Sequence, residues 1–373
     1  MATTQAQDTP PIHLKVWTWI RENQGLAILI ALAAVLMFFI LREASSSPRD
    51  TLKFIRLTYA GLTDGALLAL IALGLVLVFK STDVINFAHM EFMLLGGFIG
   101  YQFLIWFEPM MQSGFVSTLP TGLQQPIVVF LALSGMIGVS VLIGIILERL
   151  ILRPLIGEPV ISVIMVTIGL SNVFHAIVGS IWGTLPQKLP VEVIPDDMFT
   201  EAGRFEIAME GARRPIFLSH ENLVLIALVL MITALLLLFF QRSKYGIAMR
   251  AAADDQQAAM SMGISIRVVF AFAWSLAAVT AAIAGLMIGE TSVGVSAQEI
   301  PVVGLRAFPV IILGGLDSIS GAILGGLIIG LVEVYTGGYL DPSLKSIAPY
   351  VVLLIILMVR PYGLFGQEII ERV

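Results

Sequence analysis

Long apolar runs dominate this chain of 373 residues, and they constrain its fold more than any other feature. Hydrophobic residues make up 58% of the sequence and charged residues only 13%, and the mean hydropathy is +0.95, far outside the range of soluble domains. The runs are continuous rather than alternating, which argues against a membrane β-barrel. Because a backbone in lipid must satisfy its own hydrogen bonds, the runs are expected to be helices. The sequence therefore predicts an all-α integral membrane protein, a polytopic helical bundle.

Crossing the hydrocarbon core takes about 20 apolar residues, and ten segments reach or approach that length. We expect spans near residues 25–41, 57–79, 92–107, 127–147, 159–182, 222–240, 268–289, 302–313, 319–339 and 347–359. The spans at 302–313 and 347–359 are short, and the first run is the least secure. A cleaved signal peptide ending near Ala44 is the alternative interpretation of that first run.

The spans fall into two groups of four, separated by the extra span at 222–240. The groups, 57–182 and 268–359, would enter the membrane in opposite directions, as in the inverted repeats of transporters. No residue-level repeat is visible, so the pseudo-inverted repeat is an argument from topology. We expect residues 1–56 to be an N-terminal extension, 57–365 to form the transmembrane domain, and 366–373 to be a cytoplasmic tail.

Lysine and arginine in short loops predict the orientation. With ten spans, the basic loops and both termini fall on one side, which is therefore expected to be cytoplasmic; the basic residues are Lys80, Arg149, Arg153, Arg242, Lys244, Arg250, Arg267 and Arg360. The segment 183–221 then lies outside. The four basic residues between the first two spans disagree, because they would lie outside: Arg42, Arg49, Lys53 and Arg56. Either 25–41 is not a full span, or 51–56 is an interfacial helix whose long side chains reach water.

The interval 245–264 is polar, rich in alanine and glycine, and set between two apolar runs. Residues 246–253 have high helix propensity. Asp254 is expected to cap a second short helix, with Gln257 completing a capping box and Gly263 ending the helix. A rigid helical elbow of this kind suits the docking of another protein, although an ordinary helical connector fits the same pattern.

Two polar groups of residues lie at membrane depth. The first contains Asn86, His89 and Glu91. A charge at mid-membrane costs roughly 3 kcal/mol, so such residues face a cavity or a partner. His89 and Glu91 would point apart on a helix, and no further ligand spacing follows, so no metal site is expected. We expect these residues to hydrogen-bond across helices and to close the cytoplasmic end of a pathway.

The second group is the glycine- and serine-rich break at 313–326, which includes Gly314, Gly315, Ser318 and Gly321. It divides one apolar run into two, which suggests unwound backbone in a protein-lined cavity. Close packing of helices through small residues explains the glycines equally well.

Several kinds of chemistry are missing from the sequence. With no cysteine, neither disulfides nor thiolate metal sites are available. No phosphate-binding loop ending in Lys-Ser/Thr occurs, so the chain cannot hydrolyse ATP by that route. A net charge of −5 and the lack of a basic aromatic patch argue against nucleic acid. No cofactor is expected, and the remaining classes are a transporter subunit, a channel or an intramembrane enzyme.

A series of motifs in one order resembles the branched-chain amino acid permeases of ABC importers. The motifs occupy 61–74, 84–91, 148–149, 153–155, 167–171, 246–255, 263–264, 313–315, 321–326 and 360–365. Three positions depart from the family pattern, since Met90 stands where glycine is usual, and Asp317 and Ser320 where glycine and proline are common. These departures put the solute in doubt, because urea and short-chain amide importers use closely similar permeases.

The resemblance implies a permease subunit of an ATP-driven importer in the bacterial plasma (inner) membrane, and not an enzyme. It would translocate branched-chain or other apolar amino acids. Its implied partners are a second related permease, two cytoplasmic ATPase subunits, an external solute-binding protein and membrane lipid. The alternative is a secondary carrier, which would need intramembrane carboxylates for ion coupling, with Glu91, Glu290, Glu299 and Glu333 as candidates.

The resemblance also implies two sets of site residues. The ATPase-coupling set lies within 245–264 and comprises Tyr245, Gly246, Arg250, Ala251, Asp254, Asp255 and Gly263. The pathway set comprises Asn86, His89, Glu91, Gly314, Gly315, Ser318 and Gly321.

Overall fold

A computed structural model describes residues 37–366, with gaps at 39, 44, 83, 156–157, 196–203, 213 and 292–293. The predicted first span and the predicted C-terminal tail lie almost entirely outside the described residues. Within them the chain is mostly helical, and seven helical segments are long and apolar enough to cross a membrane. The prediction of a polytopic helical membrane protein is confirmed at this level.

The seven long helices coincide with seven of the spans expected from residue 57 onward. They are α3 (Pro48–Thr82), α4 (His89–Phe107), α5 (Thr121–Leu147), α6 (Val160–Ile181), α7 (His220–Arg242), α10 (Ile266–Thr291) and α13 (Ile319–Tyr335). α3 begins before the expected boundary, so residues 51–56 are its first turns rather than a separate interfacial helix. The last expected span is the 12-residue α14 (Ala348–Val359). A total of ten spans and the inverted repeat both stay predictions.

The prediction of one membrane-spanning helix at 302–313 is wrong. The chain there forms α11 (Glu299–Leu305) and α12 (Ala307–Gly314), which meet at Arg306. Pro309 has no N–H to donate to the carbonyl of Leu305, so a continuous helix would lose a hydrogen bond at this point. Neither piece is long enough to cross the hydrocarbon core.

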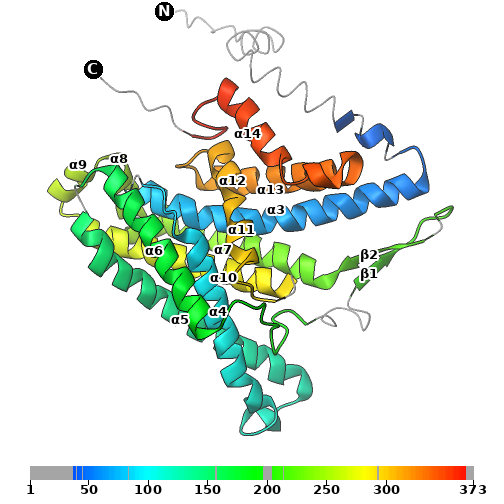
Figure 1. Ribbon diagram of the computed structural model, residues 1–373, viewed down its shortest axis with the longest axis horizontal. Coiled ribbons are helices and arrows are strands. Elements are labelled where there is room, and N and C mark those ends of the chain that lie inside the picture. The colour runs from blue at the N-terminus through cyan, green and yellow to red at the C-terminus, as the bar shows by residue number, and fades with distance from the viewer. Residues whose placement is uncertain are drawn as a thin grey trace, which may run out of the picture.

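The centre of the bundle is α3, with α13 packed along it (Figure 1). Glycines allow the two backbones to approach closely: a Cβ on Gly65 would lie 2.8 Å from Leu327 Cα, and one on Gly326 would lie 2.6 Å from the backbone nitrogen of Ala69. α10 packs on α4 in the same manner, through Gly97 and Gly285. Small residues therefore hold the core helices together by close contact, as is common in membranes.

The segment before α7 contains a β-hairpin that the all-α prediction missed. Strand β1 (Arg204–Ile207) pairs antiparallel with β2 (Ile216–Ser219). The earlier part of the segment is attached to the end of α10. Glu290 accepts hydrogen bonds from the N–H groups of Val193 and Ile194, at 2.7 and 3.1 Å. Figure 1 shows the hairpin on the opposite side of the bundle from the two short helices that follow α7.

Candidate functional site: the elbow and two polar turns

The interval after α7 forms two short helices, as predicted, which we call the elbow: α8 (Lys244–Asp254) and α9 (Gln256–Ser261). The hydroxyl of Ser243 caps α8 by accepting from the N–H of Gly246 at 2.8 Å. The predicted cap of the second helix is wrong by one residue. α8 continues through Asp254, and the extended residue Asp255 caps α9. Gly263 ends the elbow with a φ of +85°, as expected of a helix stop.

The Asp255 carboxylate accepts hydrogen bonds from the N–H groups of Gln257 and Ala258, at 2.8 and 2.9 Å. Gln257 is therefore a donor to the cap through its backbone, and it does not occupy the third helical position that a capping box requires. An alanine-rich helix has no local reason to end at the first of two aspartates, which explains the shift of one residue.

The elbow is fixed to the bundle through three contacts. Arg250 donates a hydrogen bond to the backbone carbonyl of Phe240 in α7. Tyr245 stacks on Phe272 of α10, with ring centroids 4.2 Å apart and planes inclined by 26°. Gly246 is so close to α7 that an added Cβ would lie 2.5 Å from the carbonyl oxygen of Phe239. The elbow is thus a rigid extension of α7 and α10.

The elbow has one buried and one exposed apolar face. Met249, Ala252 and Ala259 are buried against the bundle, and Ala251 is half-buried. On the outer face Ile247 is 52% exposed, Met260 53% and Met262 84%. Exposed apolar side chains on a rigid polar segment are typical of a surface that another protein covers.

The polar turn between α3 and α4 and the start of α4 contain Asn86, His89 and Glu91, and each of these three side chains has a different hydrogen-bond partner. His89 is fully buried, and its Nε2 lies 3.1 Å from the carbonyl oxygen of Ile71 in α3. Asn86 is 1% exposed, and its side-chain oxygen accepts from the N–H of Ala88. Asn86 therefore stabilises the start of α4 locally, whereas His89 bonds across helices as predicted.

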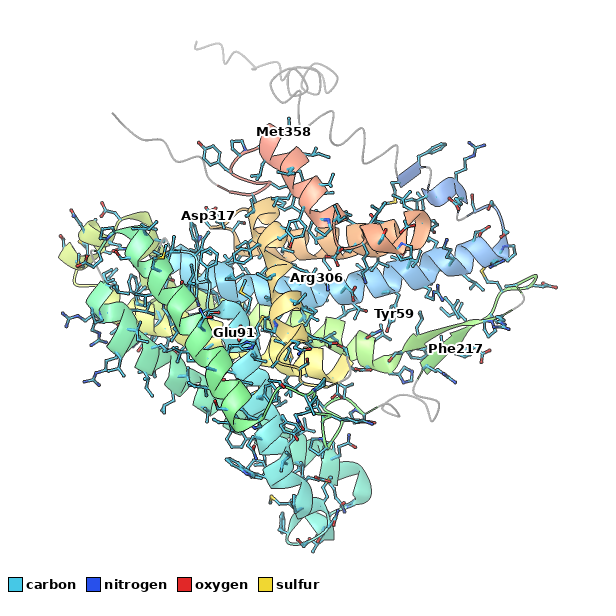
Figure 2. All side chains as sticks on the ribbon, viewed as in Figure 1. Tyr59, Glu91, Phe217, Arg306, Asp317 and Met358 are labelled. Atoms are coloured by element: carbon cyan, nitrogen blue, oxygen red, sulfur yellow. The ribbon has the colours of Figure 1, made fainter. Side chains whose placement is uncertain are left out.

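Glu91 points away from His89 and faces α6. Both of its carboxylate oxygens lie 3.3 Å from Nδ1 of His175, at the junction of α4 and α6 where Figure 2 labels Glu91. Sequence reasoning missed His175. The available signal was a single imidazole in the middle of α6, a helix without any formally charged residue.

The second polar turn joins α12 to α13. Gly315 has a φ of +103°, and Ser318 caps α13 by accepting from the N–H of Gly321 at 3.0 Å. α12 and α13 pack closely, since a Cβ on Gly325 would lie 2.6 Å from the carbonyl oxygen of Val310. The apolar run is therefore broken at this turn, and its two pieces, α12 and α13, also pack tightly through small residues.

A cavity of about 230 Å³ joins this turn to the elbow. Lys80, at the end of α3, donates to the carbonyl of Asp317 at 2.9 Å. The cavity is lined by Lys80, Leu237, Phe240, Gln241, Arg250, Asp317, Ser318, Ile319, Ser320 and Phe365. Lys80 and Arg250, which were used to predict the orientation, therefore lie on the same side of the bundle as the glycine–serine turn.

A sequence model of the family "Branched-chain amino acid transport system / permease component" matches residues 57–357. The chain belongs to this permease family. It is 30% identical over 321 residues to the high-affinity branched-chain amino acid transport system permease protein BraD of Pseudomonas aeruginosa, covering 84% of this chain and 96% of that protein. It is 28% identical to the permease protein LivH of Escherichia coli, covering 86% and 98%. No solved structure matches the permease.

Three of the four carboxylates considered for ion coupling have partners in this permease. Glu91 bonds to His175 and Glu290 to two backbone N–H groups. Glu333 pairs with Arg306 through both carboxylate oxygens, with Nε at 3.0 Å from one of them. Arg306 also lies 3.9 Å from Asp64. Because these carboxylates are engaged by groups of the protein itself, the carrier alternative is not favoured.

Proposed function

We propose that this permease is the membrane-spanning subunit of an ATP-driven importer in the bacterial inner membrane. It translocates branched-chain or other apolar amino acids delivered by an external binding protein, together with a second related permease and two cytoplasmic ATPase subunits. The names of its relatives support this solute class over urea or short-chain amides. Both termini are proposed to be cytoplasmic, and the two four-span halves to form an inverted repeat.

The observation that carries the proposal is the construction of the elbow. A self-sufficient carrier has no need of a capped helical pair that is locked to two membrane helices and exposes Ile247, Met260 and Met262. An ATP-driven importer needs such a segment, because a force generated outside the membrane must reach the helices. We assign Tyr245, Gly246, Arg250, Ala251, Asp254, Asp255 and Gly263 to this coupling role.

The proposed pathway contains Asn86, His89, Glu91, Gly314, Gly315, Ser318 and Gly321. Asn86 and His89 are sealed from solvent in this conformation, so the proposal requires a second conformation in which water reaches them. The cavity between the elbow and the glycine–serine turn supports only the second part of this pathway, because movement of Arg250 would alter a space that Ser318 also lines.

The segment 183–221, which is expected to lie outside, is proposed to face the solute-binding protein. Its hairpin, β1 and β2, lies on the side opposite the elbow in Figure 1. Its earlier residues Val193 and Ile194 are bonded to Glu290 of α10. Charges on a docking surface mainly set the association rate and its salt dependence.

The test is to reconstitute the full complex and to ask which loaded binding protein stimulates ATP hydrolysis. Stimulation by leucine, isoleucine or valine is expected, and it should disappear with Arg250→Ala. Stimulation by urea or an amide, and by no amino acid, would contradict the proposed solute class.

A further inference from the structure

Helix α6 is the least enclosed of the seven long helices. Only 17% of its most apolar stretch is buried, compared with 78% for α3 and 67% for α10. Its buried residues form one narrow stripe at helical spacing, consisting of Val163, Thr167, Leu170, Phe174 and Val178. Most of the surface of α6 therefore faces something other than this chain.

The exposed face of α6 is polar at the middle of the helix. Asn172 and His175 are both exposed and lie near the centre of its 22 residues. α7 provides the comparison, because its exposed positions are apolar throughout the membrane-spanning part: Leu223, Ala227, Leu230, Met231, Ala234, Leu235 and Leu238. The exposed face of α6 is also mostly apolar, with Ile161, Met165 and Ile177 on it. It differs from that of α7 in carrying Asn172 and His175 among these residues.

The side chain of His175 is only partly covered by α4 and α6. Its Nδ1 bonds to Glu91, yet 51% of the His175 side chain is exposed, against 9% for Glu91. A polar side chain in contact with lipid at mid-membrane carries a free-energy penalty of a few kcal/mol, and such residues normally face a partner or a water-filled space. The exposed part of the imidazole is therefore available to a ligand or to a second protein.

We propose that the face of α6 centred on Asn172 and His175 packs beside the second permease, and that these two side chains line the solute path between the two subunits. This inference rests on the proposed function, because it requires that second subunit. Gly169 and Gly179 flank the polar pair, and a Cβ on either would meet no atom within 4 Å. A second backbone can approach closely at such positions.

The chemistry of this face fits a zwitterionic solute with an apolar side chain. α6 contains no Asp, Glu, Lys or Arg, so it offers hydrogen bonds without a fixed net charge. With its Nδ1–H directed at Glu91, a neutral His175 can accept from an ammonium group through Nε2. The side-chain amide of Asn172 donates one hydrogen to the carbonyl of Ile168 and keeps a second one for a carboxylate. A path of this kind binds both ends of an amino acid weakly enough to release it.

Cysteine labelling tests the water-filled path, and the chain has no native cysteine to remove. In the reconstituted complex, Asn172→Cys and His175→Cys should react with a membrane-impermeant methanethiosulfonate at least tenfold faster than Leu235→Cys on α7. Leucine-loaded binding protein with ATP should change the rates at both positions. Rates no faster than that of Leu235→Cys would overturn the inference.

Photo-crosslinking tests the partner. Val173 on α6 and Leu230 on α7 are each 52% exposed, so a photoreactive residue at either position samples a comparable surface. The residue at 173 should form adducts with the second permease, and the one at 230 should form adducts with lipid. Adducts of 173 with lipid alone would overturn the inference even where ATP-dependent leucine uptake is normal. Crosslinks to the permease without leucine uptake would instead contradict only the proposed solute.

Discussion

Arg250 of α8 donates a hydrogen bond to the backbone carbonyl of Phe240, in the last turn of α7. Carbonyls in the last turn of a helix have no partner within that helix, and a cation there also interacts favourably with the helix dipole. One side chain thus joins the elbow to a membrane helix. Under the proposed coupling role, we expect a displacement of α8 by a docked protein to be transmitted to α7 in part through this bond.

Replacing Arg250 by alanine should therefore uncouple the complex without unfolding it. A hydrogen bond from a charged group contributes about 2 kcal/mol, which is enough to loosen the elbow but small beside the packing of seven long helices. We expect ATP-dependent uptake to fall at least tenfold while the amount of inserted protein is unchanged. The exposed Arg149→Ala is the control, and equal uptake in both variants would contradict the role of Arg250.

Asp255, rather than Asp254, should be the sensitive cap of the second elbow helix. Loss of an N-cap costs about 1 kcal/mol, and asparagine is as good a cap as aspartate. Asp255→Ala should reduce solute-stimulated ATP hydrolysis, whereas Asp255→Asn should retain most of it. If the asparagine variant fails as fully as the alanine variant, the carboxylate charge matters more than the cap.

Gly246 should not tolerate even one added methyl group. Alanine is normally favoured over glycine in a helix by about 1 kcal/mol, but here its Cβ would lie 2.5 Å from the carbonyl oxygen of Phe239 and 2.6 Å from the Cα of Phe240. Gly246→Ala should separate α8 from α7 and abolish coupled uptake. Gly138→Ala on α5, where a Cβ would meet no atom within 4 Å, should leave uptake unchanged. Normal uptake by the Gly246 variant would show that the elbow tolerates displacement from α7.

Helix existence could be predicted from the sequence, because continuous apolar runs leave a backbone in lipid few alternatives. The elbow was also predictable, since alanine-rich helices and a helix-ending glycine are local signals. Its cap was not, because two adjacent aspartates have the same local chemistry and only the length of α8 distinguishes them. The break at Arg306 was missed although its signal, Pro309, is present in the sequence, because the apolar run continues across both short helices. The contact of Arg306 with Glu333 of α13 could not be predicted, because the two residues are far apart in the chain.

The sequence indicated which polar residues lie at membrane depth, but it did not indicate which residues they contact. A polar residue at membrane depth indicates that some partner exists, but the partner of Glu91 lies 84 positions away on α6. The hairpin before α7 was missed because its strands have only four residues each, too short to show an alternating pattern against long apolar runs.

The pair of Arg306 and Glu333 should stabilise the bundle. Glu333 is 2% exposed at its side chain and Arg306 28%, and removing one partner of a mostly buried pair costs roughly 3 kcal/mol. Glu333→Ala should lower the unfolding temperature of the detergent-solubilised chain by several degrees, whereas Glu158→Ala at an exposed position should not. An unchanged unfolding temperature would leave Glu333 without a structural role and would renew the case for ion coupling.

The energy source of transport distinguishes an ATP-driven permease from a secondary carrier. The measurement is leucine accumulation in liposomes that contain either this chain alone, under a proton or sodium gradient, or the chain with the second permease, the ATPase subunits, the binding protein and ATP. We expect no accumulation by the chain alone, and accumulation by the full complex that stops when ATP is withdrawn. Accumulation by the chain alone, driven by an ion gradient, would contradict this expectation.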